Sequence, residues 1–213
     1  MDLTIIPDIL RTDENAIYLL CIIDQFSKFA NAYILNSKKS DIILGNIKSF
    51  INAYGKPNTL HCDNGKEFSN ELLNSFCEEN NIKFIHGRPY HPQSQGCIES
   101  FQKELKRLLE AKYLENKKKL SIYTTLPEVI NIYNSNLHSS TKYKPNILFY
   151  VKDNSIIEKV LSNLKKSQNK FKNSVNSIKI NSKCLLCENF VLKDKTICFK
   201  KFKKKENIIF LVK

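Results

Sequence analysis

The chain has 213 residues, enough for one sizeable domain with a small appendage. Hydrophobic residues make up 42% of it, which supports a packed core and excludes disorder of the whole chain. No apolar run approaches the roughly 18 residues that cross a bilayer, and the first residues lack the pattern of a signal peptide, so we expect no membrane partner.

The net charge of +13 is concentrated near the end of the chain. Residues 161–213 contain fourteen lysines and three acidic residues, so they carry +11 of the total. A nearly neutral body with a basic tail favours a nucleic-acid partner, because each phosphate contact releases counterions. The alternative source of this charge is a bias toward lysine, asparagine and isoleucine throughout the sequence.

The seven cysteines are odd in number and scattered, which predicts packed thiols and no disulfide framework. Cys184 and Cys187 form the single CxxC pair of the sequence. A second pair or suitably spaced histidines would be needed for structural zinc, and all four histidines lie far upstream. A zinc site is therefore not expected in this chain.

Residues 1–150 alternate between strand-like and helix-like patterns. The apolar run Ala16–Ile23 is typical of a strand buried on both faces. The predicted order is three strands, a helix, a strand, a helix, a strand and two further helices. This order predicts an α/β protein with a mixed five-stranded sheet flanked by helices. Residues 151–175 predict a lysine-rich helical linker, and residues 176–213 predict a small basic β module.

Three carboxylates occupy positions that suit a metal site. Asp2 lies on the first predicted strand, and Asp63 follows the strand Thr59–Cys62. Glu99 lies in the first turn of a long amphipathic helix predicted from about Gly96 to Lys117. Converging carboxylates raise one another's pKa, so such a group is stabilised by a divalent cation. The alternative for Asp63 is an Asp-Asn-Gly turn in which the carboxylate caps the backbone.

Several motifs resemble one family. They read YLLCIIDQFSKFANAYIL, LHCDNGKEF, GRPYHPQSQGCIES and YNSNLHSSTKYKPNILFY, and 35 residues separate Asp63 from Glu99. From Asp2 to Tyr150 the chain resembles the catalytic core of retroviral and gypsy-type retrotransposon integrases. These are DDE polynucleotidyl transferases with a ribonuclease H-like fold. A ribonuclease H or Holliday-junction nuclease fits the GRPYHPQSQG loop and the YN–HSST tail less well.

The resemblance implies that Asp2, Asp63 and Glu99 are catalytic and bind two Mg²⁺ or Mn²⁺ ions. The implied reactions are processing of DNA 3′ ends and strand transfer into target DNA, in-line displacements at phosphorus. The implied partners are the element's DNA ends, target DNA and further copies of the chain. The implied location is the nucleus, reached from the cytoplasm. The residues that match DNA contacts are Tyr90, Ser94, Gln95, Gln102, Lys103 and Lys106.

The chain departs from the family pattern at three places. Gln102 stands where the family has asparagine, Ile122 stands where tryptophan is common, and no zinc-binding domain precedes Asp2. The last departure predicts either a piece of a longer polyprotein or a truncated or domesticated copy. The alternative function is therefore a remnant that binds DNA without catalysis. Asp24 also matches the family outside the triad, and we interpret it as structural.

Overall fold

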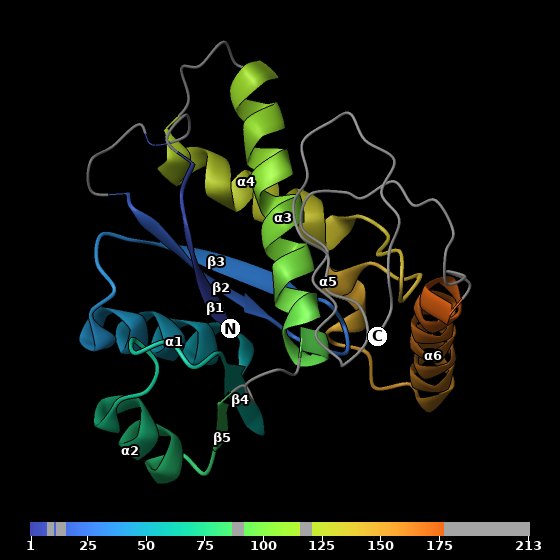
Figure 1. Ribbon diagram of the computed structural model, residues 1–213, viewed down its shortest axis with the longest axis horizontal. Helices are drawn as coiled ribbons and strands as arrows, with labels where there is room; N and C mark the ends of the chain where they lie inside the picture. The colour runs from blue at the N-terminus through green and yellow to red at the C-terminus, as the bar shows by residue number, and fades with distance from the viewer. Residues whose placement is uncertain (8–10, 12–15, 87–91, 116–120, 177–213) are drawn as a thin grey trace, which may run out of the picture. The chain divides into compact units, whose positions relative to one another are not determined.

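The computed structural model describes residues 1–7, 11, 16–86, 92–115 and 121–176 and shows an α/β protein (Figure 1). The chain divides into two compact units, residues 1–160 and 161–213. The described strands are β1 (Asp2–Ile5), β2 (Tyr18–Ile23), β3 (Ala30–Leu35), β4 (Thr59–Cys62) and β5 (Lys83–His86). The helices are α1 (Ser40–Tyr54), α2 (Glu71–Glu79), α3 (Pro92–Glu115), α4 (Ile122–Ser135), α5 (Pro145–Leu148) and α6 (Asn154–Asn176).

The predicted α/β class is confirmed, and the five described strands form two hydrogen-bonded sheets. Strands β1, β2 and β3 form an antiparallel sheet in which Asp2 pairs with Cys21 and Cys21 with Ala32. Strands β4 and β5 form a parallel pair. A hydrogen bond from the Met1 amino group to the His61 carbonyl connects the start of β1 to β4. The prediction of a single five-stranded sheet is thus not confirmed.

Strand β2 lies at the centre of the first unit, with a packed core on each of its faces. Leu19 and Cys21 point to a core made with α3 and α4, and Leu20 and Ile22 point to a second core made with α1, α2 and β4. Adjacent residues of a strand face opposite ways, so a strand between two cores needs apolar residues at every position. The continuous apolar run Ala16–Ile23 is explained by the burial of both faces of β2.

Two helix boundaries show how local sequence sets the frame of the site. Helix α1 ends where Gly55 adopts φ +96°, a backbone conformation that favours glycine, and the Gly55 N–H donates to the Ile51 carbonyl. Helix α3 begins at Pro92, four residues before the predicted start at Gly96. Proline is well tolerated at the first helical position, where the missing N–H would have no partner in the helix.

The later part of the chain is described only in part. Residues 154–176 form α6, and the predicted β module falls mostly on residues 177–213, which lie outside the described residues. The domain boundaries at 150 and 175 therefore stay predictions. No helix in the described ranges is long and apolar enough to cross a bilayer.

We predict that Leu105→Ala destabilises the protein by about 2–5 kcal/mol, because Leu105 is fully buried between α3 and the sheet. The matched control is Leu114→Ala on the same helix. The Leu114 side chain is 64% exposed, so the change should cost less than about 0.5 kcal/mol. Urea unfolding measures both variants. Equal losses would contradict the packing described for α3.

Candidate active site

The side chain of Asp2 is fixed by hydrogen bonds from its own strand and from α3. The Leu3 N–H donates to Asp2 Oδ1 at 2.7 Å, and Gln102 Nε2 donates to Asp2 Oδ2 at 3.0 Å. Asp2 is half-buried, with Cys21 opposite it on β2. Both oxygens have a donor on one side, and their remaining lone pairs are available to a further ligand.

Asp63 follows β4 directly and lies in a tight turn. The Gly65 N–H donates to Asp63 Oδ1 at 3.1 Å, so the carboxylate caps the backbone two residues ahead. A Cβ atom at Gly65 would lie 2.8 Å from Glu67 Oε2 and 3.1 Å from Asp63 Oδ1. Glycine at this position therefore lets the turn close against the carboxylate. The capping predicted as an alternative is present, and it leaves the second carboxylate oxygen free of that bond.

The Asp63 carboxylate is close enough to Asp2 to affect the charge of Asp2. The pKa of Asp2 is raised from its ordinary value of 3.8, first because burial disfavours the charged form and then because of the nearby Asp63 carboxylate. The hydrogen bonds from Leu3 and Gln102 act in the opposite direction. The pair thus concentrates negative charge in a partly desolvated place, which an electropositive ligand would relieve.

Glu99, the third predicted carboxylate, is on α3 but is exposed and does not line the cavity that Asp2 and Asp63 share. One helical turn later, Gln102 faces Asp2 in its place. In the described part of the chain, no three His, Cys, Asp or Glu residues are grouped so as to hold a metal ion. The structure therefore brings two of the three predicted ligands together.

The residues predicted to contact DNA are distributed along α3 and the segment before it. Tyr90 lies outside the described residues, and Ser94 and Gln95 belong to α3, although their side chains are not described. Lys103 is exposed and Lys106 is half-buried. Burial raises the pKa of the Cys21 thiol, and the positive charge of Lys106 acts in the opposite direction. Lys106 is thus near the strand residue that pairs with Asp2. The DNA contacts of Lys103, Lys106 and the residues before them stay predictions.

Gln102 has a role that the sequence reasoning missed. Its amide donates to Asp2, whereas the predicted contact of Gln102 with DNA stays a prediction. The signal was available, since Gln102 follows Glu99 by three residues and shares its helix face. What the sequence could not show was the distance between that face and a strand 100 residues earlier.

Asp24 has a structural part, as interpreted from the sequence, at the turn between β2 and β3. Its Oδ2 accepts hydrogen bonds from Ser27 N–H at 2.7 Å and from Ser27 Oγ at 2.6 Å. Lys28 in the same turn has φ +66° and donates its N–H to the Asp24 carbonyl. Asp24 also lines the cavity, so the turn forms one of its walls.

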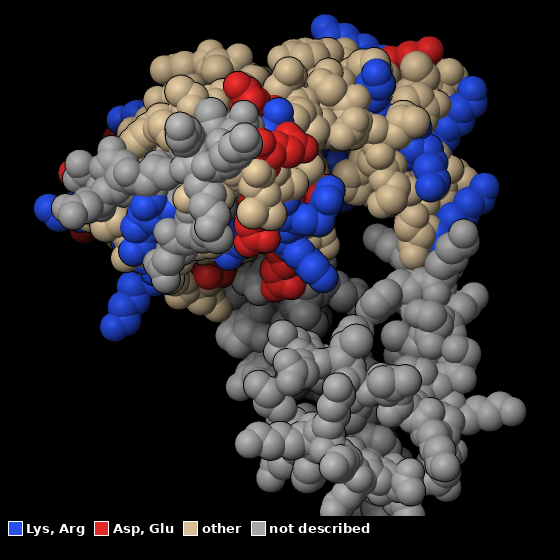
Figure 2. All heavy atoms as spheres, turned by 90° about the horizontal axis from the view of Figure 1, so that it is seen from above, with Lys and Arg blue, Asp and Glu red and all other residues tan. Residues whose placement is uncertain are grey.

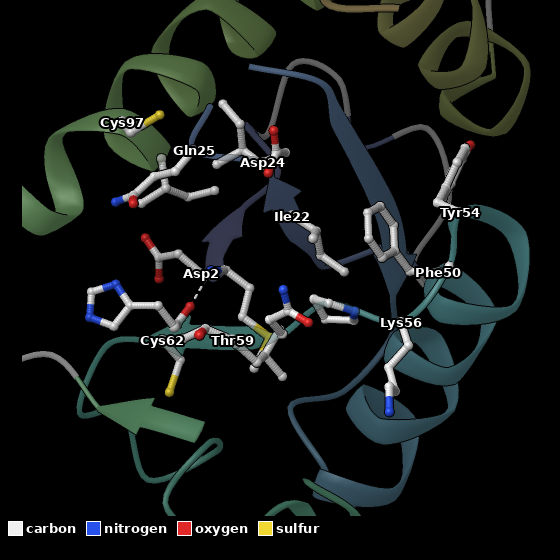
Figure 3. Close-up of a pocket in the computed structure, with 18 of the residues that line it drawn as sticks. Asp2, Ile22, Asp24, Gln25, Phe50, Tyr54, Lys56, Thr59, Cys62 and Cys97 are labelled. Atoms are coloured by element: carbon white, nitrogen blue, oxygen red, sulfur yellow. Dashed lines mark hydrogen bonds between the residues drawn. The ribbon is translucent and has the colours of Figure 1, made fainter. Parts of the chain in front are cut away.

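The cavity has a volume of about 490 Å³ and extends well beyond the two carboxylates. Figure 3 shows Asp2 on one side and Phe50 and Tyr54 from the end of α1 on the opposite side. Gly55 and Lys56 continue this opposite wall. The sequence did not predict that the end of α1 lies across a cavity from Asp2, because that depends on the packing of segments about 50 residues apart in the chain.

The chemistry of the carboxylate pair fits a hard divalent cation. Carboxylate oxygens are preferred ligands of Mg²⁺ and Mn²⁺, and a carboxyl whose pKa is raised by burial and by a neighbouring carboxylate is stabilised in its charged form by a cation. Asp2 and Asp63 would provide ligands of this kind, and Glu99 lies one turn from the amide that holds Asp2.

Comparison with known proteins gives this geometry a family context. Residues 1–92 match the family model of the integrase core domain. The retrovirus-related Pol polyprotein from transposon gypsy of Drosophila melanogaster is 30% identical over 139 residues, which are 65% of this chain and 13% of that protein. The Pro-Pol polyprotein of feline foamy virus is 29% identical over 141 residues, 66% of this chain and 12% of that protein. The chain thus spans about an eighth of these relatives' length.

Solved structures share the fold. A chain of the simian T-cell lymphotropic virus intasome in complex with PP2A regulatory subunit B56 gamma has a TM-score of 0.60 and 22% identity, covering 64% of this chain and 49% of that one. The HTLV-2 integrase catalytic core domain in complex with magnesium (trimeric form) has a TM-score of 0.55 and 21% identity, covering 62% and 84%. The predicted resemblance to a retroviral-type integrase core is confirmed in sequence and in fold.

We predict that Asp63→Asn stabilises the protein in metal-free buffer by about 0.2–1 kcal/mol, the range for partly exposed charge pairs. Because the pKa of Asp2 is raised on folding, its contribution to stability is fully present below pH 3.8 and is lost as the pH rises through the raised pKa. The variant should lose less stability than the wild type over that pH interval. Urea unfolding from pH 3 to 7 with a chelator measures this difference. Identical pH dependences would contradict the proximity of the two carboxylates.

Proposed function

We propose that this chain is the catalytic part of a retrotransposon-type integrase, a DDE polynucleotidyl transferase that processes DNA 3′ ends and joins them to target DNA. The observation that carries this proposal is the pairing of Asp2 and Asp63 beside α3, with Gln102 holding Asp2 in place. The match to the integrase core domain and the shared fold support it. The α/β frame would correspond to one ribonuclease H-like sheet, with β1 beside β4.

In this proposal Asp2 and Asp63, together with Glu99 from the exposed face of α3, would hold two Mg²⁺ or Mn²⁺ ions. When bound, such ions neutralise charge at the phosphate and activate the attacking hydroxyl or water. The HTLV-2 core in complex with magnesium supports the choice of metal. Gln102 would fix the orientation of the Asp2 carboxylate, because its amide already donates to Oδ2. Small displacements of a ligand cost large factors in rate, so this positioning supports the reaction.

The positive charges of α3 would meet the DNA backbone. Lys103 is exposed and Lys106 is half-buried beside the site, so both can approach phosphates. On the face seen in Figure 2, Lys and Arg side chains are interspersed with acidic ones. DNA held beside the carboxylates would be contacted by Lys103 and Lys106.

We also propose that the chain works as a homo-multimer in the nucleus, which it would reach from the cytoplasm. Joining two DNA ends to one target requires more than one active site acting together. The HTLV-2 core structures described as trimeric and dimeric forms support assembly.

A second candidate is a remnant that binds DNA without catalysis. The net charge of +13 favours this reading as well, because phosphate binding alone accounts for it. The two candidates differ in whether the carboxylates matter. Catalysis requires them, whereas non-catalytic binding improves when negative charges next to DNA are removed.

We predict that purified protein joins a duplex DNA end to plasmid DNA in the presence of Mg²⁺ or Mn²⁺. Asp63→Asn and Glu99→Gln should each lower the rate by at least about a hundredfold, the order expected when one catalytic group is lost. The matched control is Glu110→Gln, which removes an exposed charge from the same helix and should leave the rate unchanged. Gel analysis of joined products measures all four proteins.

Activity that survives both carboxylate substitutions would exclude the proposed mechanism. DNA binding without any joined product, with equal or tighter binding by Asp63→Asn, would favour the non-catalytic candidate.

A further inference from the structure

Four aromatic rings form a preassembled cluster at the end of the cavity away from the carboxylates. We call Phe29, Phe50, Tyr54 and Phe149 the aromatic cluster. Phe29 stacks on Phe149 with ring centroids 4.5 Å apart, and the Tyr54 centroid lies 5.0 Å from that of Phe29 and 4.9 Å from that of Phe50. These rings come from α1, from the turn before β3 and from the residue after α5, so their arrangement is fixed by tertiary packing.

The two outer rings of the cluster remain accessible. Phe29 and Phe50 are buried, whereas Tyr54 and Phe149 are only half-buried and line the cavity. Asn31 Nδ2 donates to the Tyr54 hydroxyl at 3.4 Å, which restricts the ring. Flat apolar surface that is already ordered costs little entropy when a ligand stacks on it.

The same cavity joins this aromatic end to the carboxylate end. Asp2, Asp63, Tyr54 and Phe149 all line one space of about 490 Å³, within the roughly 300–1,000 Å³ of sites that hold small organic groups. The exposed residues Gln25, Asn58 and Thr59 add polar groups to the lining of the same space. A ligand that fills this space would carry a charged or metal-binding group at one end and a flat ring at the other.

We propose that the aromatic end of the cavity holds an unstacked nucleobase of the DNA strand whose phosphate lies at Asp2 and Asp63. This inference rests on the proposed function, and it assigns a second contact to the same DNA. A nucleotide has the two chemical parts that the cavity separates, and bases stack on aromatic side chains without regard to sequence. The contact would select strands with an unpaired base beside the reacting phosphate, since an unpaired base costs less to extrude.

The test compares two single-stranded oligomers of equal length and charge, one of thymidine nucleotides and one of abasic sugar phosphates. With oligomers of about twelve nucleotides, we expect wild-type protein to bind the base-bearing strand about tenfold more tightly than the abasic one. The ratio of the two affinities removes the shared electrostatic contribution. Fluorescence anisotropy in the presence of Mg²⁺ measures both affinities.

Tyr54→Ala should reduce the logarithm of this affinity ratio to about one half of the wild-type value or less. The affinity for the abasic strand should stay the same. Tyr54→Leu and Phe149→Leu keep apolar bulk in the cluster and remove a flat ring, so they test the same point if the alanine variant unfolds. The matched control is Tyr123→Ala, because Tyr123 is an exposed ring on α4 and does not line the cavity. Circular dichroism and thermal unfolding check each fold.

The proposal is overturned if both leucine variants fold and keep the wild-type ratio, or if the wild type shows no preference for the base-bearing strand. Asp63→Asn separates this test from that of the proposed function. It should abolish strand transfer and keep the base-dependent ratio, because the aromatic end is intact. If the wild-type protein shows no strand transfer but its affinity ratio depends on Tyr54, the base site is supported and the proposed reaction is excluded.

Discussion

The Asp63 carboxylate lies near that of Asp2 in a partly desolvated place, so the charged form of Asp2 is disfavoured and a cation beside the pair would stabilise it. Burial and the neighbouring charge both raise the pKa of Asp2, while bonds from Leu3 and Gln102 oppose the shift. A divalent cation would offset this repulsion, and the similarity to integrase cores is the reason that the proposed function places one there.

Much of the first unit can be understood as the frame that brings these two residues together. Strand β2 is buried on both faces, so two cores set its position. It pairs with β1, the strand that contains Asp2. Helix α3 packs on one of these cores through Phe101 and Leu105, and the same packing points Gln102 at Asp2. Helix α1 packs on the other core through residues that include Phe50 and is capped by Gly55. Both residues line the aromatic end of the cavity.

The sequence predicted the parts of this frame that depend on local pattern. The α/β class, helix α1 and the strand before Asp63 follow from hydrophobic period, turn residues and a favourable start for a helix. Contacts between distant segments were not predicted from the sequence. The hydrogen bond of Gln102 to Asp2, the exposed position of Glu99 and the aromatic cluster each depend on how segments pack, and no local pattern records that. The division of the strands into sheets of three and two has the same origin.

The most direct test of the carboxylate pair as a cation site is to observe where a paramagnetic ion binds. Mn²⁺ added to isotopically labelled protein should broaden the amide signals of Asp2, Asp63 and Gln102 first, and those around Glu99 with them. Excess Mg²⁺ should reverse the broadening by competition for the same oxygen ligands. Broadening that begins elsewhere in the chain, or that Mg²⁺ does not reverse, would contradict the account.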